Sequence, residues 1–440
     1  MESCETSSKT DYTAYSKRWL ILLIYFYFAV MSAFQWYQYS SITNIIVRYY
    51  SVDNFYVNCT TLMFNVTFIA LVFPASYLLN KVGMRWSVIL GTFFTAAGAL
   101  VKVASVKPGL FWVTFLGQTL VSFTQAVAMP MPPFMPAVWF PSNQVNTACS
   151  IAVNGTMLGI ALGFVVPPIM VQNHDNLEEV GAGLATMFYW TAGLSTGSFI
   201  LAILFLESMP ATPPSHEQAL KDSACAPLVK ILKNLFLNPC YVLLLIAYAI
   251  NQGVVNSMST FLNQMILPYF KNGEEFAGRI GLTLTVAGMM GTTLCGIIMD
   301  RTLKYINAAM SVFALTVVGM IAFTFSLKTQ SEIFVYLATS FVGFFLGGYV
   351  PIAYSFSYEV TYPEPEGTSS GMLSAAAQIV TTIFTLLYAA MISSLGNVWA
   401  NIAFSLILLI GTIIHLFMQP TLRRQAAYEN VVSINEPLLR

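Results

Sequence analysis

The residues best suited to bind a small molecule are amide and aromatic side chains that lie inside apolar stretches of the chain. The stretch "AFQWYQYSS" (33–41) lies within a long hydrophobic segment, and helical periodicity predicts Trp36 and Tyr39 on one face with Gln35 on the neighbouring flank. Polar groups are costly in the hydrocarbon layer of a membrane unless they meet a partner or water, so they mark candidate sites. The face of an aromatic ring attracts a cation and can hold a quaternary ammonium group without a hydrogen bond. The pattern therefore favours a pocket for a small organic cation or a neutral polar molecule.

Amide side chains recur in later apolar segments at spacings that place them on one face of a helix. Gln252 and Asn256 are four residues apart in "YAINQGVVNSMSTFLNQMIL" (248–267), so both lie on the same side of a helix. Such amides either line a binding site or tie neighbouring helices together by hydrogen bonds, and both interpretations stay open. The candidate substrate-binding residues, all of them within apolar segments, are Gln35, Trp36, Tyr39, Thr156, Met157, Gln252, Asn256, Tyr349 and Gln378.

Three glycines at intervals of four residues predict a close contact between two helices. Gly155, Gly159 and Gly163 form this ridge in a segment that also contains Thr156 and Met157. Small residues at that spacing let two helix backbones approach closely in a membrane. The two candidate site residues therefore lie beside a tight helix contact.

The charged groups that are missing from the spanning segments limit the possible substrates. No Asp, Glu, His or Arg falls near the middle of a predicted span, and Lys102 lies near a helix end, where its amine can reach the membrane surface. Proton-coupled carriers need a titratable group, and strongly anionic substrates need buried cations. We therefore expect a neutral molecule, a zwitterion or an organic cation that moves down its gradient without ion coupling.

The sequence carries no signature of a metal site, a cofactor or an enzyme. His174, His216 and His415 fall in loops or near a helix end, which leaves an intramembrane metal or haem site without histidine ligands. Methionines in "AMPMPPFMP" (128–136) suit cuprous ions, but the packing interpretation is the stronger one. No phosphate loop, nucleophile elbow or zinc motif occurs. The net charge of zero gives no basic field for nucleic acid.

The composition predicts an all-α polytopic membrane protein. Of the 440 residues, 57% are hydrophobic and 9% are charged, whereas soluble domains contain about 25% charged residues. Apolar runs of about 20 residues, the length that spans a bilayer as a helix, recur along the chain. The twelve predicted spans are 19–47, 57–80, 86–106, 110–138, 143–171, 184–206, 239–270, 279–299, 306–327, 331–358, 367–394 and 397–418.

The spans divide into two groups of six, which is the layout of a major facilitator superfamily transporter. The Pro- and Ser-containing break at 207–238 reads as a cytosolic linker between an N-terminal half, 19–206, and a C-terminal half, 239–418. Polar tails at 1–18 and 419–440 complete the chain, and the first tail has no apolar core typical of a cleaved signal peptide. Thirteen of the 19 Lys and Arg residues fall on the side of the two tails and six on the other, which predicts that both termini are cytosolic.

Two short polar loops occupy equivalent positions in the two halves. They are "NKVGMR" (80–85) and "GIIMDRTLK" (296–304), each after the second span of its half. Major facilitator proteins carry an acidic and basic loop at this position, although ordinary positively charged turns would also explain the pattern. The candidate gating residues are Asn80, Arg85, Asp300 and Arg301.

Several long motifs resemble the feline leukaemia virus subgroup C receptor (FLVCR) family of major facilitator proteins, and the resemblance extends from about residue 17 to residue 424. The motifs are "AFQWYQYSSITN" (33–44), "LFWVTFLGQ" (110–118), "VWFPSNQVNTACSIAVNGTMLGIALGFVVPP" (138–168), "STFLNQMILPYF" (259–270), "EEFAGRIGLTLTVAGMMGTTLCGIIMD" (274–300) and "EVTYPEPEGTSSGMLSAAAQI" (359–379).

The resemblance implies facilitated diffusion of choline and ethanolamine by alternating access, with haem or another amphipathic metabolite as the alternative cargo. In choline-transporting members a tryptophan and a glutamine line the pocket, and these match Trp36 and Gln378. Two further pocket residues of the family differ here, because its glutamine falls on Met157 and its tyrosine on Asn256. Direct transfer of choline specificity is therefore in doubt. A receptor or scaffold that no longer transports is the alternative from another functional class.

The expected partners are a small-molecule substrate and the lipid bilayer, with no nucleic acid. The carboxyl tail contains "YENV" (428–431) and ends in "EPLLR" (436–440), two short patterns that resemble signals read by sorting adaptors. We expect the plasma membrane as the location, with an endosomal, lysosomal or other intracellular membrane as the alternative.

Overall fold

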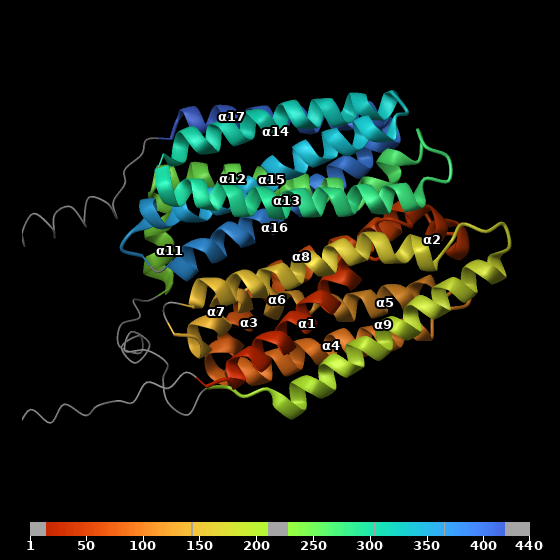
Figure 1. Cartoon of the computed structure of the whole chain (residues 1–440), viewed down its shortest axis with the longest axis horizontal. Coiled ribbons are helices and arrows are strands. Elements are labelled where there is room, and N and C mark those ends of the chain that lie inside the picture. Colours follow the sequence, from red (N-terminus) through yellow and green to blue (C-terminus); the bar gives the residue numbers. More distant parts are fainter. Residues whose placement is uncertain (1–14, 142–143, 210–227, 303, 365, 419–440) are drawn as a thin grey trace, which may run out of the picture.

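The computed structural model describes residues 15–141, 144–209, 228–302, 304–364 and 366–418 (Figure 1). Every regular element among these residues is a helix, and eleven helices are long and apolar enough to cross a membrane. The all-α polytopic fold is therefore confirmed. The helices are α1 (Lys17–Tyr37), α2 (Thr43–Tyr50), α3 (Asn54–Val82), α4 (Met84–Val103), α5 (Phe111–Ser122), α6 (Gln125–Ala128), α7 (Met131–Trp139), α8 (Val145–Met170), α9 (Leu177–Phe205), α11 (Leu228–Leu237), α12 (Pro239–Ile266), α13 (Glu274–Thr302), α14 (Tyr305–Lys328), α15 (Glu332–Thr361), α16 (Glu366–Ser394) and α17 (Asn397–Leu416).

The helices form two bundles that lie side by side. Figure 1 shows α1 to α9 in one bundle, called here the N half, and α12 to α17 in the other, called the C half. The halves meet where α8 packs against α13 and where α3 packs against α16. Gly278 and Gly281 of α13 make room for Phe164 of α8, since a Cβ on Gly281 would lie 2.4 Å from the phenylalanine ring.

The two ends of the bundles differ in the elements that they contain. We call the end where α1 begins, α11 lies and α17 finishes the inner end, because the charge count predicts that it faces the cytosol. The opposite end, with α2 and the turn 267–273, is called the outer end. At the inner end the amphipathic helix α11 buries Ile231 and Leu235, and Asn234 donates a hydrogen bond to Glu364 over 2.8 Å.

The first predicted span is interrupted, which corrects the expectation of one helix over 19–47. The helix α1 ends at Tyr37 and α2 begins at Thr43. A helix end inside a protein leaves carbonyl groups without intrahelical donors. Side chains supply those donors here, because Gln118 Nε2 donates to the Gln35 carbonyl over 2.5 Å and Asn263 Nδ2 to the Ser41 carbonyl over 2.6 Å. The break is therefore held by residues from two other helices.

The fourth predicted span, 110–138, is divided among α5, α6 and α7 rather than forming one helix. Proline lacks the backbone N–H that continues a helix, and Pro130 separates α6 from α7. Met131 and Met135 are fully buried in the apolar core of the N half. Their packing fits the interpretation that these methionines fill space in the core.

The predicted glycine ridge is confirmed as a close contact between α8 and α1. A Cβ on Gly159 would lie 2.4 Å from the Val30 carbonyl oxygen, and one on Gly163 would lie 3.0 Å from that of Phe34. No larger side chain fits at such distances without a shift of the backbone. The ridge thus fixes how α1 sits against α8, and α1 carries the central aromatic residues.

Candidate substrate site between the two halves

Trp36 lies in the last turn of α1, in contact with α3. Its indole Nε1 donates a hydrogen bond to the Thr61 carbonyl over 3.2 Å. The indole stacks on Phe64 with ring centroids 5.6 Å apart and planes at 12°, and the Tyr37 ring follows at 5.0 Å. We call Trp36 and Tyr37 the ring pair. Because three contacts orient the indole, its position is well defined.

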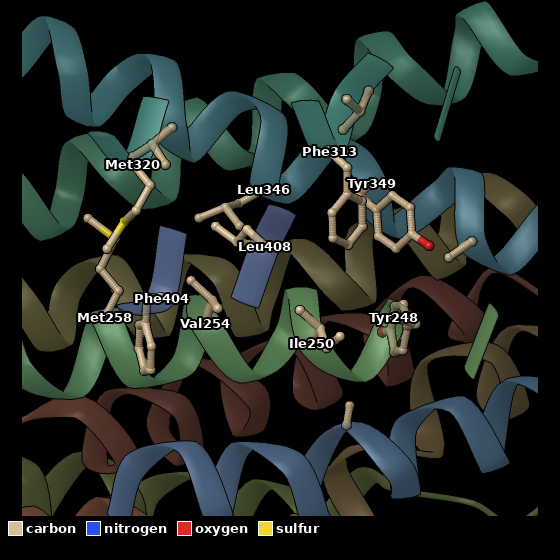
Figure 2. Close-up of a cluster of buried hydrophobic side chains, with 14 of the residues drawn as sticks. Tyr248, Ile250, Val254, Met258, Phe313, Met320, Leu346, Tyr349, Phe404 and Leu408 are labelled. Atoms are coloured by element: carbon tan, nitrogen blue, oxygen red, sulfur yellow. The ribbon is translucent and has the colours of Figure 1, made fainter. Parts of the chain in front are cut away.

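Tyr37 connects the ring pair to the C half. Its hydroxyl donates to Asn256 Oδ1 of α12 over 3.1 Å, and Asn256 Nδ2 donates to Thr381 Oγ1 of α16 over 3.3 Å. Figure 2 shows Val254 and Met258 of α12 pointing into the core of the C half. The amide at Asn256 therefore lies on the face of α12 that is turned toward the other half.

Two further predicted residues lie about one helical turn toward the inner end from the hydrogen bonds that join Tyr37, Asn256 and Thr381. Gln252 is half-buried on the Asn256 face of α12, and its amide makes a long hydrogen bond of 3.4 Å to Asn251. Gln378 precedes Thr381 by three residues on α16 and is buried, and its side-chain oxygen Oε1 has no hydrogen-bond partner in the described part of the chain. The structure thus brings Trp36 and these amides to the interface between the halves.

Thr156 and Met157 lie on α8 and are half-buried. Met157 is two helical turns from Phe164, so both share the side of α8 that faces α13. The Phe164 ring lies 5.4 Å from the Tyr37 ring. Met157 is therefore on the interface side of its helix, about 10 Å further toward the inner end at 1.5 Å of rise per residue.

Gln35 points away from the interface into the interior of the N half. Its Oε1 accepts a hydrogen bond from Lys102 Nζ over 2.7 Å, and its Nε2 donates to Ser195 Oγ over 3.1 Å. Lys102 is 1% exposed and also donates to Gln118 Oε1 over 2.9 Å. This corrects the expectation that the Lys102 amine reaches the membrane surface. The amine instead lies inside the N half, beside the end of α1.

Tyr39 and Tyr349 each lie inside one half rather than between the halves. The Tyr39 hydroxyl is 3.5 Å from Thr114 Oγ1 of α5. The Tyr349 hydroxyl is 3.0 Å from His415 Nε2, and Figure 2 shows its ring beside Phe313 within the C half. The helical spacing that links Tyr39 to Trp36 in the sequence does not hold, because α1 ends at Tyr37.

The predicted gating residues are described only in part. Arg85 Nη2 donates to the Ile203 carbonyl over 3.5 Å, and its guanidinium lies 6.0 Å from the centre of the Trp86 ring. The side chains of Asn80, Asp300 and Arg301 lie outside the described part of the structure. A gating role for these four residues stays a prediction.

Sequence reasoning missed a cluster that connects the halves at the outer end. Glu274 accepts hydrogen bonds from Asn44 Nδ2 and Asn173 Nδ2, each over 2.7 Å. Asn263 Nδ2 donates to Asn44 Oδ1 over 3.1 Å as well as to the Ser41 carbonyl. We call Asn44, Asn173, Asn263 and Glu274 the outer clamp. Glu274 falls between two predicted spans, so no span pointed to it. The seven-residue spacing of Asn256 and Asn263 was a usable signal, because it places both amides on one face of a helix.

Comparison with known proteins gives the family. The family model of the Major Facilitator Superfamily matches residues 21–385. The choline/ethanolamine transporter flvcr2a of Danio rerio is 40% identical over 96% of this chain and 91% of its own length. The choline/ethanolamine transporter FLVCR1 of Felis catus is 41% identical over 93% of this chain and 74% of its own length. This chain belongs to the FLVCR family of the Major Facilitator Superfamily.

Members of this family are transporters and not enzymes, so this FLVCR-family chain is an integral membrane transporter for a small molecule. Solved structures agree on the fold. A D-xylose-proton symporter superposes with a TM-score of 0.76 at 13% identity, covering 92% of this chain and 98% of the symporter. An inward-facing bacterial homologue of the lysosomal transporter Spinster gives a TM-score of 0.71 at 12% identity over 92% of this chain and 98% of its own.

Proposed function

We propose that this FLVCR-family chain is a facilitative, alternating-access carrier of small amines, with choline and ethanolamine as its substrates. The observation that carries the proposal is the ring pair, which lies between the halves and is hydrogen-bonded to both of them. Trp36 is bonded to α3 of the N half and Tyr37 to α12 of the C half. Relatives over nearly the whole chain are named choline/ethanolamine transporters, which supports the same substrate class.

The chemistry of the ring pair suits the charged end of these substrates. A cation over an indole or phenol ring gains about 2 kcal/mol where water is excluded, and it needs no hydrogen bond for this attraction. The neighbouring amides of Gln252, Asn256 and Gln378 supply dipoles without a fixed charge. Weak, uncharged recognition of this kind suits a carrier, because the substrate must also leave the site.

The same residues provide a means of coupling binding to conformational change. The Tyr37 bond to Asn256 joins the halves at the ring pair, and the outer clamp joins them at the outer end. A substrate that competes for Asn256 alters the contacts between the halves, and ligand binding can shift a conformational equilibrium only through such differential contacts. We propose that opening and closing of the outer clamp forms part of the transport cycle.

The test is uptake of labelled choline and labelled ethanolamine into cells that express the chain, at two external pH values. We expect saturable, pH-insensitive uptake that Trp36→Ala lowers about 30-fold at substrate concentrations below saturation, since the lost ring contact is worth about 2 kcal/mol. Trp190→Ala is the matched control, because Trp190 is an exposed tryptophan on α9. Unchanged uptake by Trp36→Ala at equal surface expression would contradict the proposal.

The alternatives predict different results in the uptake assay or in thermal melting of the purified protein. Haem or another amphipathic metabolite as the substrate predicts no saturable amine uptake, and a non-transporting receptor predicts that no solute raises the melting temperature of the purified protein.

We further propose that the chain acts at the plasma membrane, with an intracellular membrane as the alternative. Surface biotinylation of the full chain and of a chain lacking 428–440 tests this location and the sorting-adaptor motifs, which lie outside the described residues.

A further inference from the structure

The helices α3 and α16, one from each half, each carry a buried amide oxygen that has no hydrogen-bond partner in the described part of the chain. They are Oδ1 of Asn65 on α3 and Oε1 of Gln378 on α16. The two residues are 3% and 4% exposed. A buried acceptor without a donor destabilises a protein by about 1 to 3 kcal/mol, so such a group calls for an explanation. Asn65 is not among the residues that the sequence marks as candidates for the site.

Each amide lies about one helical turn toward the inner end from a residue that is hydrogen-bonded to the ring pair, directly or through Asn256. Asn65 follows Thr61 by four residues on α3, and the Thr61 carbonyl accepts the indole hydrogen bond. Gln378 precedes Thr381 by three residues on α16, and Thr381 is linked through Asn256 to Tyr37. The helices α3 and α16 run in opposite directions, so both steps lead toward the inner end.

The two helices that carry the amides belong to different halves and pack against each other. Asn65 directly follows Phe64, whose ring stacks on Trp36, and it shares a helix face with Thr61. One unpaired amide oxygen thus belongs to an N-half helix that contacts the ring pair, and the other belongs to the C-half helix packed against it. A ligand between α3 and α16 that donates two hydrogen bonds would satisfy both oxygens and would connect the two halves.

We propose that Asn65 and Gln378 together bind the N–H groups of a protonated primary amine beneath the ring pair, so that the carrier prefers ethanolamine to choline. This inference rests on the proposed function. A primary ammonium group has three N–H donors, whereas the nitrogen of a quaternary ammonium has none. The quaternary ammonium group of choline, bound in the same place, would donate to neither amide oxygen, and a site built to hydrogen-bond its substrate discriminates strongly against an analogue that lacks the donor. The ring pair attracts both cations and does not separate them.

The experiment measures how well a series of unlabelled amines inhibits the uptake of labelled ethanolamine. Along the series, methyl groups replace the N–H hydrogens of the ammonium group one at a time. The competitors are ethanolamine, N-methylethanolamine, N,N-dimethylethanolamine and choline. For the unaltered chain we expect the inhibition constant to rise along the series, by at least tenfold from ethanolamine to choline. In Asn65→Leu and in Gln378→Leu we expect this ratio to fall at least fivefold. Asn154→Leu, which replaces an exposed amide on α8, should leave the ratio unchanged.

Binding to purified protein separates the possible failures. The melting temperature without ligand reports whether each variant folds, and the shift produced by each amine repeats the series without transport. Equal affinities along the series, tighter choline binding, or an unchanged ratio in Asn65→Leu would overturn the inference while leaving an amine carrier in place. If no member of the series is transported or raises the melting temperature of the unaltered chain, the proposed function fails as well.

Discussion

The first helices of the two halves, α1 and α12, both carry amides and hydroxyls within apolar segments, but they direct these groups differently. In α1, Gln35 turns into its own half, where Lys102 donates to it. In α12, Asn256 and Asn263 turn outward and bond to the N half. The helix α12 is continuous over Pro239–Ile266, whereas α1 ends at Tyr37.

The difference shows that α1 and α12, which both carry polar side chains in apolar segments, have different structural roles. The Gln35 amide of α1 ties the end of its helix to Lys102 and Ser195 inside the N half, and the ring pair follows directly after it. The amides of α12 supply the contacts between the halves, which must change if the halves move. Amides that stabilise one half should therefore affect stability, and amides that connect the halves should affect the conformational equilibrium.

The largest expected effect is the loss of stability in Gln118→Leu. This change removes an acceptor of Lys102 and the donor to the Gln35 carbonyl, leaving the buried Lys102 amine with one acceptor among the described side chains. We expect the free energy of unfolding to fall by about 3 kcal/mol, measured as a lower melting temperature of the purified protein. The double variant Lys102→Met/Gln118→Leu should regain part of this loss, because the buried amine that lost an acceptor is gone. A double variant less stable than the single one would contradict this account.

A smaller effect, on conformation rather than stability, is expected for Asn263→Leu. The variant loses the hydrogen bonds to the Ser41 carbonyl and to Asn44, which together are worth about 2 kcal/mol to the closed outer end. In a cysteine-free background with Gln252→Cys as a reporter, we expect an impermeant thiol reagent to label the protein from outside about 30-fold faster. Asn397→Leu is the matched control, because the Asn397 amide bonds to Met265 within the C half. Equal labelling rates in the two variants would show that α12 does not hold the outer end closed.

The smallest effect is expected for Tyr349→Phe. The hydroxyl contact with His415 lies within the C half, so its loss should lower the free energy of unfolding by about 1 kcal/mol and leave the ratio of ethanolamine to choline uptake unchanged. Tyr37→Phe loses one hydroxyl contact as well, but that contact crosses to Asn256. We expect only this second variant to change uptake. A change in substrate preference in Tyr349→Phe would contradict this account and would show that Tyr349 belongs to the substrate site.

Much of the fold was predictable because its signals are local. The length and hydropathy of the apolar runs predict spanning helices, since each must satisfy its own backbone hydrogen bonds in a membrane. The spacing of Gly155, Gly159 and Gly163 predicts a close helix contact, and the contact with α1 confirms it. The four-residue spacing of Gln252 and Asn256 predicts a shared face, which the continuous helix α12 preserves.

The site was less predictable, because its geometry depends on partners distant in the sequence. The segment "QYSSI" (38–42) contains neither proline nor glycine, so nothing local indicates that α1 ends there. Helical periodicity carried through the break therefore placed Tyr39 beside Trp36. The position of Lys102 near a helix end suggested an exposed amine. In the structure the amine donates hydrogen bonds to Gln35 and Gln118 in the interior of the N half.

The sequence by itself determined that this chain is a polytopic helical membrane protein, and its motifs indicated the FLVCR family. Hydropathy, helical spacing and motif order are properties of contiguous residues, so they can be read without coordinates. Only the tertiary structure decided which polar groups face one another across the halves. It placed Gln35 and Tyr39 inside the N half, formed the outer clamp, and left the amide oxygens of Asn65 and Gln378 unpaired on two helices that pack against each other. Those outcomes depend on the direction of each side chain after the helices pack, which no local pattern specifies.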